Sequence, residues 1–270
     1  MKRIAATVAA AALCAAFTPA ALPAGALATT YVQTSYASYL NGDDGWVPSY
    51  QSKSSYNKKG RATVVTSTSY NDGKVDGKHK VKYTYDKKGR MKSYKLYEKG
   101  KFSGTTKFTY GKSKTVQKNY NAKGKYTGKT VSKSSKTKYT SVTYDAKGKQ
   151  TGKYVSTYTK KGLLKSSTSY SGKELSYKET YTIKNNKWTK SVSKSYDDDG
   201  KVSYTSTSMY SYSGKYTTEK QYSEDNTLYN VSKYYTEKKT GRQIQVWSTD
   251  YYGDTKVKTT YKTTYTYKAI

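Results

Sequence analysis

The chain has 270 residues, a formal net charge of +32 and 34 tyrosines, against three phenylalanines and three tryptophans. So positive a chain attracts polyanions. Its single histidine, His79, and single cysteine, Cys14, argue against histidine-based triads, thiol nucleophiles and ordinary zinc sites.

Residues 1–28 have the pattern of a cleaved secretory signal peptide. Lys2 and Arg3 supply the positive start, residues 4–17 are apolar, and residues 26–28 (Ala-Leu-Ala) form a small-residue cleavage site. Lipidation at Cys14 is the alternative, but the residue before it is a leucine, which is too bulky for that signal. We expect a secreted, extracellular protein with no disulfide and no transmembrane segment after cleavage, and any attachment to the cell wall would rest on charge.

Residues 29–55 differ in composition from the rest of the mature chain and are predicted to form a lead-in or cap. The segment 41–46 is acidic and turn-like, and Pro48 is expected to interrupt any strand. The remaining residues, 56–270, are predicted to form one array of Tyr/Lys-rich β-hairpins.

A fixed period organises this array. Gly100, Gly124, Gly148 and Gly172 stand 24 residues apart, and each is followed by lysine. A period of this size indicates stacked copies of one supersecondary unit.

Many of the turns share one chemistry, in which a tyrosine ends a strand, Asp or Asn comes next, and a glycine then precedes Lys or Arg. Asp or Asn can bond its own backbone, and glycine takes the positive φ that ends a type I turn with a bulge. Each such element therefore predicts a hairpin. These elements lie at 56–61, 85–90, 120–125, 144–149 and 196–201.

Between the turns, side chains alternate with period two. Tyr83 and Tyr85 share one face of a strand, whereas Lys80 and Lys82 share the other. We therefore predict an all-β fold, an extended antiparallel meander of about 14–17 strands in an open twisted or spiralling sheet. Rows of tyrosine rings across neighbouring strands are expected to replace the thick aliphatic core that this composition lacks.

The Tyr-Asp-x-x-Gly-Arg/Lys element, as at 85–90 and 144–149, resembles the YD repeats of RHS-type bacterial surface and toxin-shell proteins. The Gly-Lys-x-x-Gly element, as at 124–128, is similar to the MORN-variant repeats of secreted and antitoxin-like proteins. The resemblance covers roughly residues 56–253. It implies a β-meander or spiralling sheet that binds or encloses something without doing chemistry. The long shell and the C-terminal toxin domain expected of an RHS toxin are absent from the sequence.

Few residues are candidates for catalysis. His79 lies between two lysines and is interpreted as a solvated residue near a strand start. Most acidic residues fall in turns, where turn chemistry explains them. The strand-borne acids Glu179, Glu219 and Asp250 could serve a glycosidase, which needs two facing carboxylates, but they are most simply cross-strand ion partners of lysine.

A metal site is not predicted either. The run 197–200 (Asp-Asp-Asp-Gly) suggests calcium, but Ser208 stands where a bidentate glutamate is expected. We therefore expect no catalytic residues, no metal, no cofactor and no enzymatic activity.

Positive charge concentrates between Lys80 and Lys165, where 25 Lys or Arg stand against three acidic residues, a net charge of +22. Tyrosine interleaved with lysine suits anionic polymers, because rings stack on sugars or bases and ammonium groups neutralise phosphates or carboxylates. The candidate ligand-binding residues are Lys80, Lys82, Tyr83, Tyr85, Lys107, Phe108, Tyr110, Lys125, Tyr126, Lys149 and Tyr154.

The leading hypothesis is a secreted protein that binds an anionic polymer of the cell envelope or an acidic glycan of host mucus, with nucleic acid as another ligand of the same kind. One alternative is a structural or toxin-associated repeat shell, spacer or protein-interaction module whose lysines only keep the strands soluble. Another is an enzyme acting on wall glycans through Glu179 or Glu219. The sequence leaves the ligand and the oligomeric state open.

Overall fold

The computed structural model describes residues 31–42, 45–71, 73–237, 243–252, 255–256 and 261–269. The predicted signal peptide, residues 1–28, lies outside the described residues. Within those ranges the regular structure is antiparallel β-strand without any helix, as the alternation of side chains predicts. Accordingly, no helix capable of crossing a membrane is found in the described part of the chain.

The described residues form 19 strands. They are β1 (Tyr31–Gly42), β2 (Gly45–Tyr56), β3 (Ala62–Asn71), β4 (Lys74–Tyr85), β5 (Met91–Glu98), β6 (Lys101–Tyr110), β7 (Lys114–Asn121), β8 (Tyr126–Ser134), β9 (Lys138–Asp145), β10 (Gln150–Tyr158), β11 (Leu164–Ser171), β12 (Glu174–Lys184), β13 (Lys187–Tyr196), β14 (Val202–Ser213), β15 (Tyr216–Tyr222), β16 (Leu228–Thr236), β17 (Gln243–Tyr252), β18 (Thr255–Lys256) and β19 (Tyr261–Ala269).

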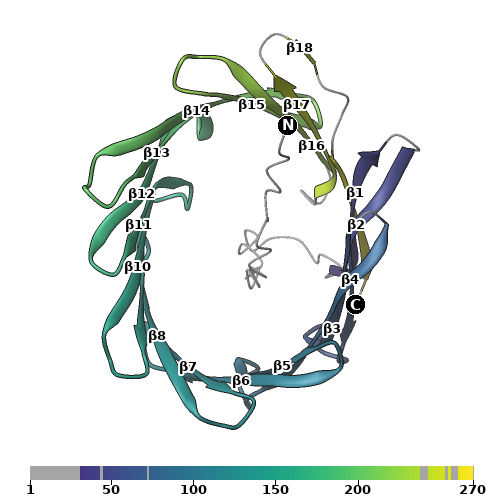
Figure 1. The fold of residues 1–270 in the computed structure, drawn as a ribbon, viewed down its shortest axis with the longest axis vertical. Helices are drawn as coiled ribbons and strands as arrows, with labels where there is room; N and C mark the ends of the chain where they lie inside the picture. Colours follow the sequence, from purple (N-terminus) through teal and green to yellow (C-terminus); the bar gives the residue numbers. More distant parts are fainter. Residues whose placement is uncertain are drawn as a thin grey trace, which may run out of the picture.

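These strands close into a barrel, which Figure 1 shows in end view. Each strand from β1 to β16 pairs antiparallel with the next strand in the chain, and β19 pairs with both β17 and β1. The ring has 18 strands, because β18 pairs only with β17. The predicted open sheet of 14–17 strands is therefore wrong in closure and in strand number. Closure pairs the two edge strands that an open sheet would expose.

Aromatic rings and hydroxyls join the two ends of the chain at the seam between β1 and β19. Tyr36 packs against Tyr50 of β2 and against Tyr265 of β19, with ring centroids 5.6 and 5.4 Å away. The hydroxyls of Ser38 and Thr263, which are 225 residues apart in the chain, lie 3.1 Å from each other. The seam is thus packed in the same way as the other strand pairs of the wall.

The 24-residue repeat corresponds to one hairpin. Gly100, Gly124, Gly148 and Gly172 lie in the turns that come after β5, β7, β9 and β11, with φ between 59° and 86°. Turns after odd-numbered strands lie on one rim of the barrel, which we call the Gly100 rim. Turns after even-numbered strands, such as the turn that contains Gly60, lie on the opposite rim, the Gly60 rim.

The turn 145–149 shows the geometry of the predicted turns. The Asp145 amide donates to the Lys149 carbonyl at 3.0 Å, the Gly148 amide donates to the Asp145 carbonyl at 3.2 Å, and the Lys149 amide donates to the Asp145 carboxylate at 2.9 Å. The same three bonds recur in the turns 57–61, 86–90, 121–125 and 197–201. The hairpins predicted from these elements are confirmed.

The predicted lead-in, residues 29–55, belongs to the barrel wall wherever it is described. It supplies β1 and nearly all of β2, and β1 completes the ring. Pro48 does not interrupt β2, because it lies opposite Tyr39 beside a shift in register, where a missing amide donor is tolerated. Residues 43–44 of the acidic turn lie outside the described residues.

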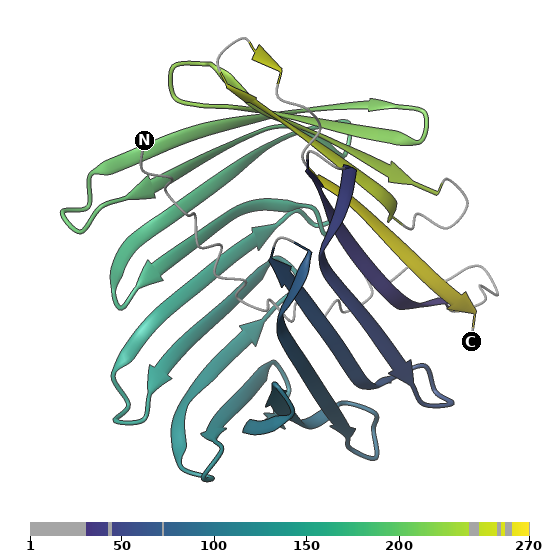
Figure 2. The ribbon, with the colours of Figure 1, turned by 45° about the vertical axis from the view of Figure 1, so that its right-hand side comes forward.

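The wall is a single layer of strands with two faces (Figures 1 and 2). Residues directly opposite each other on neighbouring strands point to the same side, so the registers assign side chains to one face or the other around the ring. All the buried side chains share one face, and they are Val81, Thr106, Ser156, Ser167, Ser191, Asn230 and Ser232. We call it the inner face, because the concave side of a closed wall leaves the least room for each side chain. The opposite side is the outer face.

Aromatic rows run along the inner face. Tyr83, Tyr94 and Phe108 come from three consecutive strands, with successive ring centroids 6.1 and 5.9 Å apart. Such pairs contribute about 0.5–1.5 kcal/mol each beyond their burial. Val81 is the single aliphatic residue among the buried side chains of the described chain. The prediction that tyrosine rows replace a thick core is therefore confirmed.

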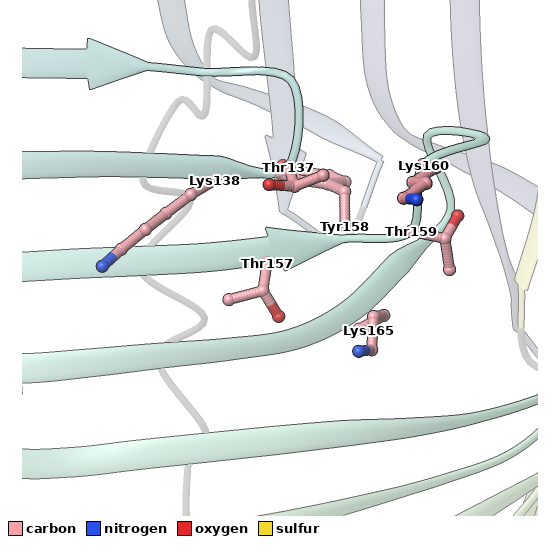
Figure 3. Close-up of a pocket in the computed structure, with 7 residues that line it drawn as sticks. All are labelled: Thr137, Lys138, Thr157, Tyr158, Thr159, Lys160 and Lys165. Carbon is pink, nitrogen blue, oxygen red and sulfur yellow. The ribbon is translucent and has the colours of Figure 1, made fainter.

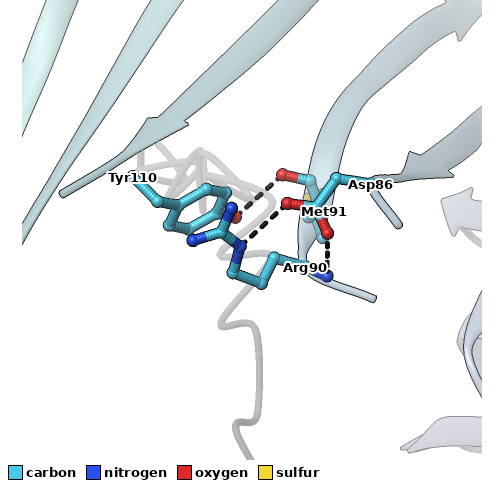
Figure 4. A network of polar contacts seen from close by, with 4 residues as sticks. All are labelled: Asp86, Arg90, Met91 and Tyr110. Atoms are coloured by element: carbon cyan, nitrogen blue, oxygen red, sulfur yellow. Dashed lines mark hydrogen bonds and ion pairs between the residues drawn. The ribbon is translucent and has the colours of Figure 1, made fainter. Parts of the chain in front are cut away.

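At the Gly60 rim, the arginine of one Tyr-Asp-x-x-Gly-Arg element ties two hairpins together (Figure 4). Arg90 forms an ion pair with Asp86 at 2.8 Å, and its guanidinium carbon lies 4.6 Å from the centre of the Tyr110 ring. The Tyr110 hydroxyl donates to the Met91 carbonyl at 2.8 Å. The element therefore shapes its own turn and anchors the end of β6 as well.

Candidate functional site

Strand lysines on the outer face lie directly opposite one another. Lys107 of β6, Lys118 of β7 and Lys129 of β8 are consecutive cross-strand partners and form one row of three cationic side chains. Like charges that oppose each other directly destabilise an antiparallel pair. Further lysine pairs of this kind are Lys82–Lys95, Lys114–Lys133 and Lys178–Lys194.

No carboxylate compensates these lysines. Within the described stretch 73–236, no lysine forms an ion pair with a carboxylate of the same stretch, and the ion pair found there joins Arg90 to Asp86 inside one turn. Solvent and salt are therefore the counter-charge of the outer face in the free protein.

Tyrosine rings of the outer face hold lysines in place once per hairpin. The ammonium groups lie over rings of a neighbouring strand in four consecutive hairpin pairs: Lys82 over Tyr97 at 5.4 Å, Lys107 over Tyr120 at 5.1 Å, Lys129 over Tyr144 at 5.3 Å and Lys153 over Tyr170 at 4.8 Å. We call these four pairs the lysine–tyrosine ladder. A cation–π contact at an exposed site contributes about 0.5–1 kcal/mol, which orients the lysine without neutralising its charge.

The rings of this ladder are absent from the residues selected on sequence. The sequence does carry a signal for three of them, because each has the same parity as a lysine of its own strand: Tyr97 with Lys95 in β5, Tyr120 with Lys118 in β7, and Tyr144 with Lys138 in β9. Most aromatic rows of the wall lie on the inner face. A tyrosine with the same parity as a lysine in its strand therefore differs from these rows and lies on the outer face.

The residues predicted to bind ligand divide between the two faces and the Gly100 rim. Lys80, Lys82 and Lys107 lie on the outer face, and Tyr126 packs there against Tyr120 with ring centroids 5.9 Å apart. Lys125 and Lys149 are the last residues of turns on the Gly100 rim. Tyr83, Tyr85, Phe108, Tyr110 and Tyr154 share the inner face with the buried residues. The structure therefore places Tyr126 on the same face as the predicted strand lysines and the other predicted aromatic residues on the opposite face.

The strand-borne acids Glu179, Glu219 and Asp250 lie on the inner face, whereas the opposed strand lysines lie on the outer face. The Glu219 carboxylate accepts hydrogen bonds from the Tyr210 hydroxyl at 3.2 Å, from Gln221 Nε2 at 3.1 Å and from the Tyr234 hydroxyl at 2.8 Å. Burial and then the neighbouring Glu179 raise the pKa of Tyr181 above its ordinary value. The prediction that Glu179 and Glu219 are ion partners of lysine is therefore wrong, because alternation along the strand turns lysine and acid to opposite faces.

Burial keeps the tyrosines of this inner network protonated. It raises the pKa of Tyr210 to about 12, and the neighbouring Glu219 carboxylate adds to the increase. Burial and then Glu219 also raise the pKa of Tyr234. Both hydroxyls therefore remain donors to Glu219 well above neutral pH. On the adjacent strands, Asp250 accepts a hydrogen bond from Asn230 Nδ2 at 2.7 Å.

His79 has suggestive neighbours but no catalytic geometry. Ser67 and Glu98 are its direct cross-strand partners on the inner face. These residue types occur in hydrolytic triads, yet no hydrogen bond joins the three side chains in the described structure. Nor do any three His, Cys, Asp or Glu side chains of the described residues form a group suited to a metal ion.

No protein-family model and no curated protein sequence matches the chain. Similar solved structures include a protein of unknown function from Bacteroides fragilis NCTC 9343, 15% identical over 46% of this chain and 86% of that chain, with a TM-score of 0.24. A porin-like protein from Bacteroides uniformis ATCC 8492 is 10% identical over 89% of this chain and 97% of that chain, with a TM-score of 0.43. The TcdB2–TccC3–Cdc42 structure is 10% identical over 77% of this chain and 18% of that chain, with a TM-score of 0.17.

TM-scores this low support no statement about what the protein does or where it is located. The resemblance to YD and MORN-variant repeats stays a prediction.

Proposed function

We propose that this chain is an exported, non-enzymatic barrel protein that binds anionic polymers of the cell envelope or of host mucus through its outer face. The observation that carries the proposal is the row Lys107–Lys118–Lys129, whose like charges oppose each other without a carboxylate partner. A polyanion laid across this row relieves the repulsion between the lysines and releases its own condensed counterions. Charge therefore drives the association and steers the encounter over long range.

The geometry of the outer face suits an extended ligand. Neighbouring strands are about 4.8 Å apart, so a row of three opposed lysines presents positive charge over about 10 Å across the strands. The lysine–tyrosine ladder extends this pattern over β4 to β11, and its rings provide flat apolar surfaces beside the charges. Rings of this kind suit the sugar or polyol units that lie between the anionic groups of a linear polymer.

The test measures retention of the purified mature protein on beads that carry poly(glycerol phosphate), with dextran beads as the neutral control. We expect retention on the anionic beads only, decreasing steeply as sodium chloride is raised, because each neutralised phosphate contributes to the salt dependence. Soluble DNA and a soluble uronic acid polymer, added as competitors, rank the anionic ligands.

Equal retention on dextran, or retention on poly(glycerol phosphate) that does not change with salt, would overturn the proposal. Tight self-association without retention on any anionic polymer would instead support the structural role of a shell or spacer.

A further inference from the structure

A shallow depression interrupts the outer face where β9, β10 and β11 reach the Gly60 rim (Figure 3). Its volume is about 520 Å³, within the range of small-ligand sites. Three lysines, three threonines and Tyr158 line it, so every lining residue is either a lysine or a residue that carries a hydroxyl. No carboxylate is among them.

The cations lie around the threonines. In Figure 3, Lys160 and Lys165 lie on one side of Thr157, and Lys138 lies on the other side with its ammonium group extended along the strand. An anion seated beside Thr157 therefore has lysines on both sides of it.

Hydroxyl groups complete the lining. The Thr159 hydroxyl oxygen accepts a hydrogen bond from the Leu163 amide at 3.1 Å, which leaves its own proton available for a ligand. The hydroxyls of Thr157 and Ser166 lie 2.7 Å apart, so one of the two donates to the other. Threonine hydroxyls beside lysines are typical donors to phosphate oxygens.

The turn over the depression has no carboxylate at its first position, a feature that it shares with the turns 57–61 and 121–125, where asparagine stands there. It keeps the shared geometry, with the Thr159 amide donating to the Leu163 carbonyl at 2.8 Å and the Gly162 amide donating to the Thr159 carbonyl at 3.0 Å. The first position, however, holds Thr159 where the turn 145–149 holds Asp145. Threonine closes the turn with its hydroxyl and adds no negative charge, whereas aspartate would place a carboxylate at the edge of the depression.

We propose that this depression is a phosphate subsite, which seats one phosphate-ester group of a bound polymer. This proposal rests on the proposed function, which supplies the bound polymer. It adds that the anionic group recognised in the depression is a phosphate ester. Several cations together with hydroxyl donors match a phosphate ester, which presents more oxygen atoms to the donors than a carboxylate does. The opposed lysines elsewhere on the outer face hold the polymer by charge alone, and the depression is where an individual phosphate is recognised.

The experiment measures binding of glycerol 3-phosphate, with acetate as the carboxylate control, by calorimetry or by NMR titration. The subsite variant is Lys160→Gln/Lys165→Gln. The matched control is Lys58→Gln/Lys59→Gln, which removes the same charge from another turn of the Gly60 rim, outside the depression. Circular dichroism of both variants checks that the barrel is intact.

We expect wild type to bind glycerol 3-phosphate and to bind acetate at least about tenfold more weakly, and the subsite variant to lose about tenfold in affinity for glycerol 3-phosphate. The control variant should stay within about threefold of wild type. Equal losses in the two variants, no binding of glycerol 3-phosphate by wild type, or equal affinity for acetate would overturn the subsite. Retention on poly(glycerol phosphate) beads is measured separately. If retention depends on salt but the subsite variant is retained like wild type, the subsite is wrong and the proposed function stands. If retention does not depend on salt, the proposed function is wrong.

Discussion

At the residue scale, the second glycine of the Gly-Lys-x-x-Gly element is required by close approach of strands. A Cβ added at Gly104 would lie 2.5 Å from the carbonyl oxygen of Tyr120, which belongs to the backbone of the neighbouring strand. Backbone in the middle of a paired sheet cannot move aside as a flexible side chain can. The glycine therefore allows β6 and β7 to pair beside the register shift between β5 and β6.

We predict that Gly104→Ala destabilises the barrel by about 1–3 kcal/mol, the usual cost of overpacking a fitted position. Gly111→Ala is the control, because the nearest atom to its added Cβ is 3.7 Å away, and it should change stability by no more than about 0.5 kcal/mol. Urea unfolding followed by circular dichroism measures both values. Equal stability of the two variants would contradict this role of Gly104.

Some residue roles were readable from the sequence and others were not. The turn 145–149 could be predicted because its aspartate, glycine and lysine interact with one another over five residues. The need for Gly104 arises from Tyr120 on another strand, and the significance of Thr159 depends on lysines contributed by β9 and β11. Such roles depend on register between strands, which local sequence does not specify.

At the element scale, strands β14, β15 and β16 are joined on the inner face by one carboxylate and two tyrosines. Glu219 of β15 accepts hydrogen bonds from Tyr210 of β14 and Tyr234 of β16. These bonds exist only while the phenols are protonated, and burial raises the pKa of Tyr210 to about 12 from its ordinary value of 10.0. Above pH 10 the unfolded chain loses these protons while the folded barrel keeps them, so the network's contribution to stability decreases between pH 10 and about 12.

We therefore predict that wild type loses more stability between pH 9 and pH 11 than the variant Tyr210→Phe/Tyr234→Phe, a range that spans the ordinary tyrosine pKa of about 10. Lysines also titrate in this range, but they do so in both proteins, so the difference isolates the two phenols. Thermal unfolding at the two pH values measures it. An equal loss in the two proteins would show that the phenols do not couple to folding.

The alternation of side chains along a strand could be predicted from the sequence. Which of the two faces of the strand points into the barrel could not. In β15, Glu219 and Lys220 are adjacent and must point to opposite faces. Nothing within the strand shows which face is concave, so the acid was interpreted as a partner of lysine. Closure of the ring settles the matter by placing the buried serines and Glu219 on the same side.

At the scale of the whole molecule, the closing pair β1–β19 converts a meander into a barrel and separates the strand charges of β4 to β17. The opposed lysines Lys107, Lys118 and Lys129 face outward, whereas the acids Glu179 and Glu219 face inward. The meander itself could be predicted because each hairpin is local. Closure could not, because it joins Tyr36 to Tyr265 from opposite ends of the chain, and the proline in β2 argued against a strand there.

Closure is testable by a disulfide. Ala37 and Thr264 are direct partners across the seam, and directly opposed strand residues lie at distances that a disulfide spans. We predict that Ala37→Cys/Thr264→Cys forms an intramolecular crosslink in the folded mature protein under mild oxidation, seen as faster migration in non-reducing electrophoresis. The pair Ala37→Cys/Thr168→Cys, with Thr168 on β11, should remain reduced. Failure of the first pair to crosslink in folded protein would contradict the closed ring.

The central claim is that the uncompensated lysines of the outer face, rather than net charge as such, bind the anionic polymer. The most direct measurement is the slope of log affinity for poly(glycerol phosphate) against log salt concentration. It is compared between two variants of equal charge. The outer-face variant is Lys107→Gln/Lys118→Gln/Lys129→Gln, and the turn variant, in turns of the Gly60 rim, is Lys58→Gln/Lys59→Gln/Lys87→Gln. The account predicts a slope shallower by roughly two to three in the outer-face variant and little changed in the turn variant, since each lost phosphate contact removes nearly one unit. Equal slopes in the two variants would contradict it.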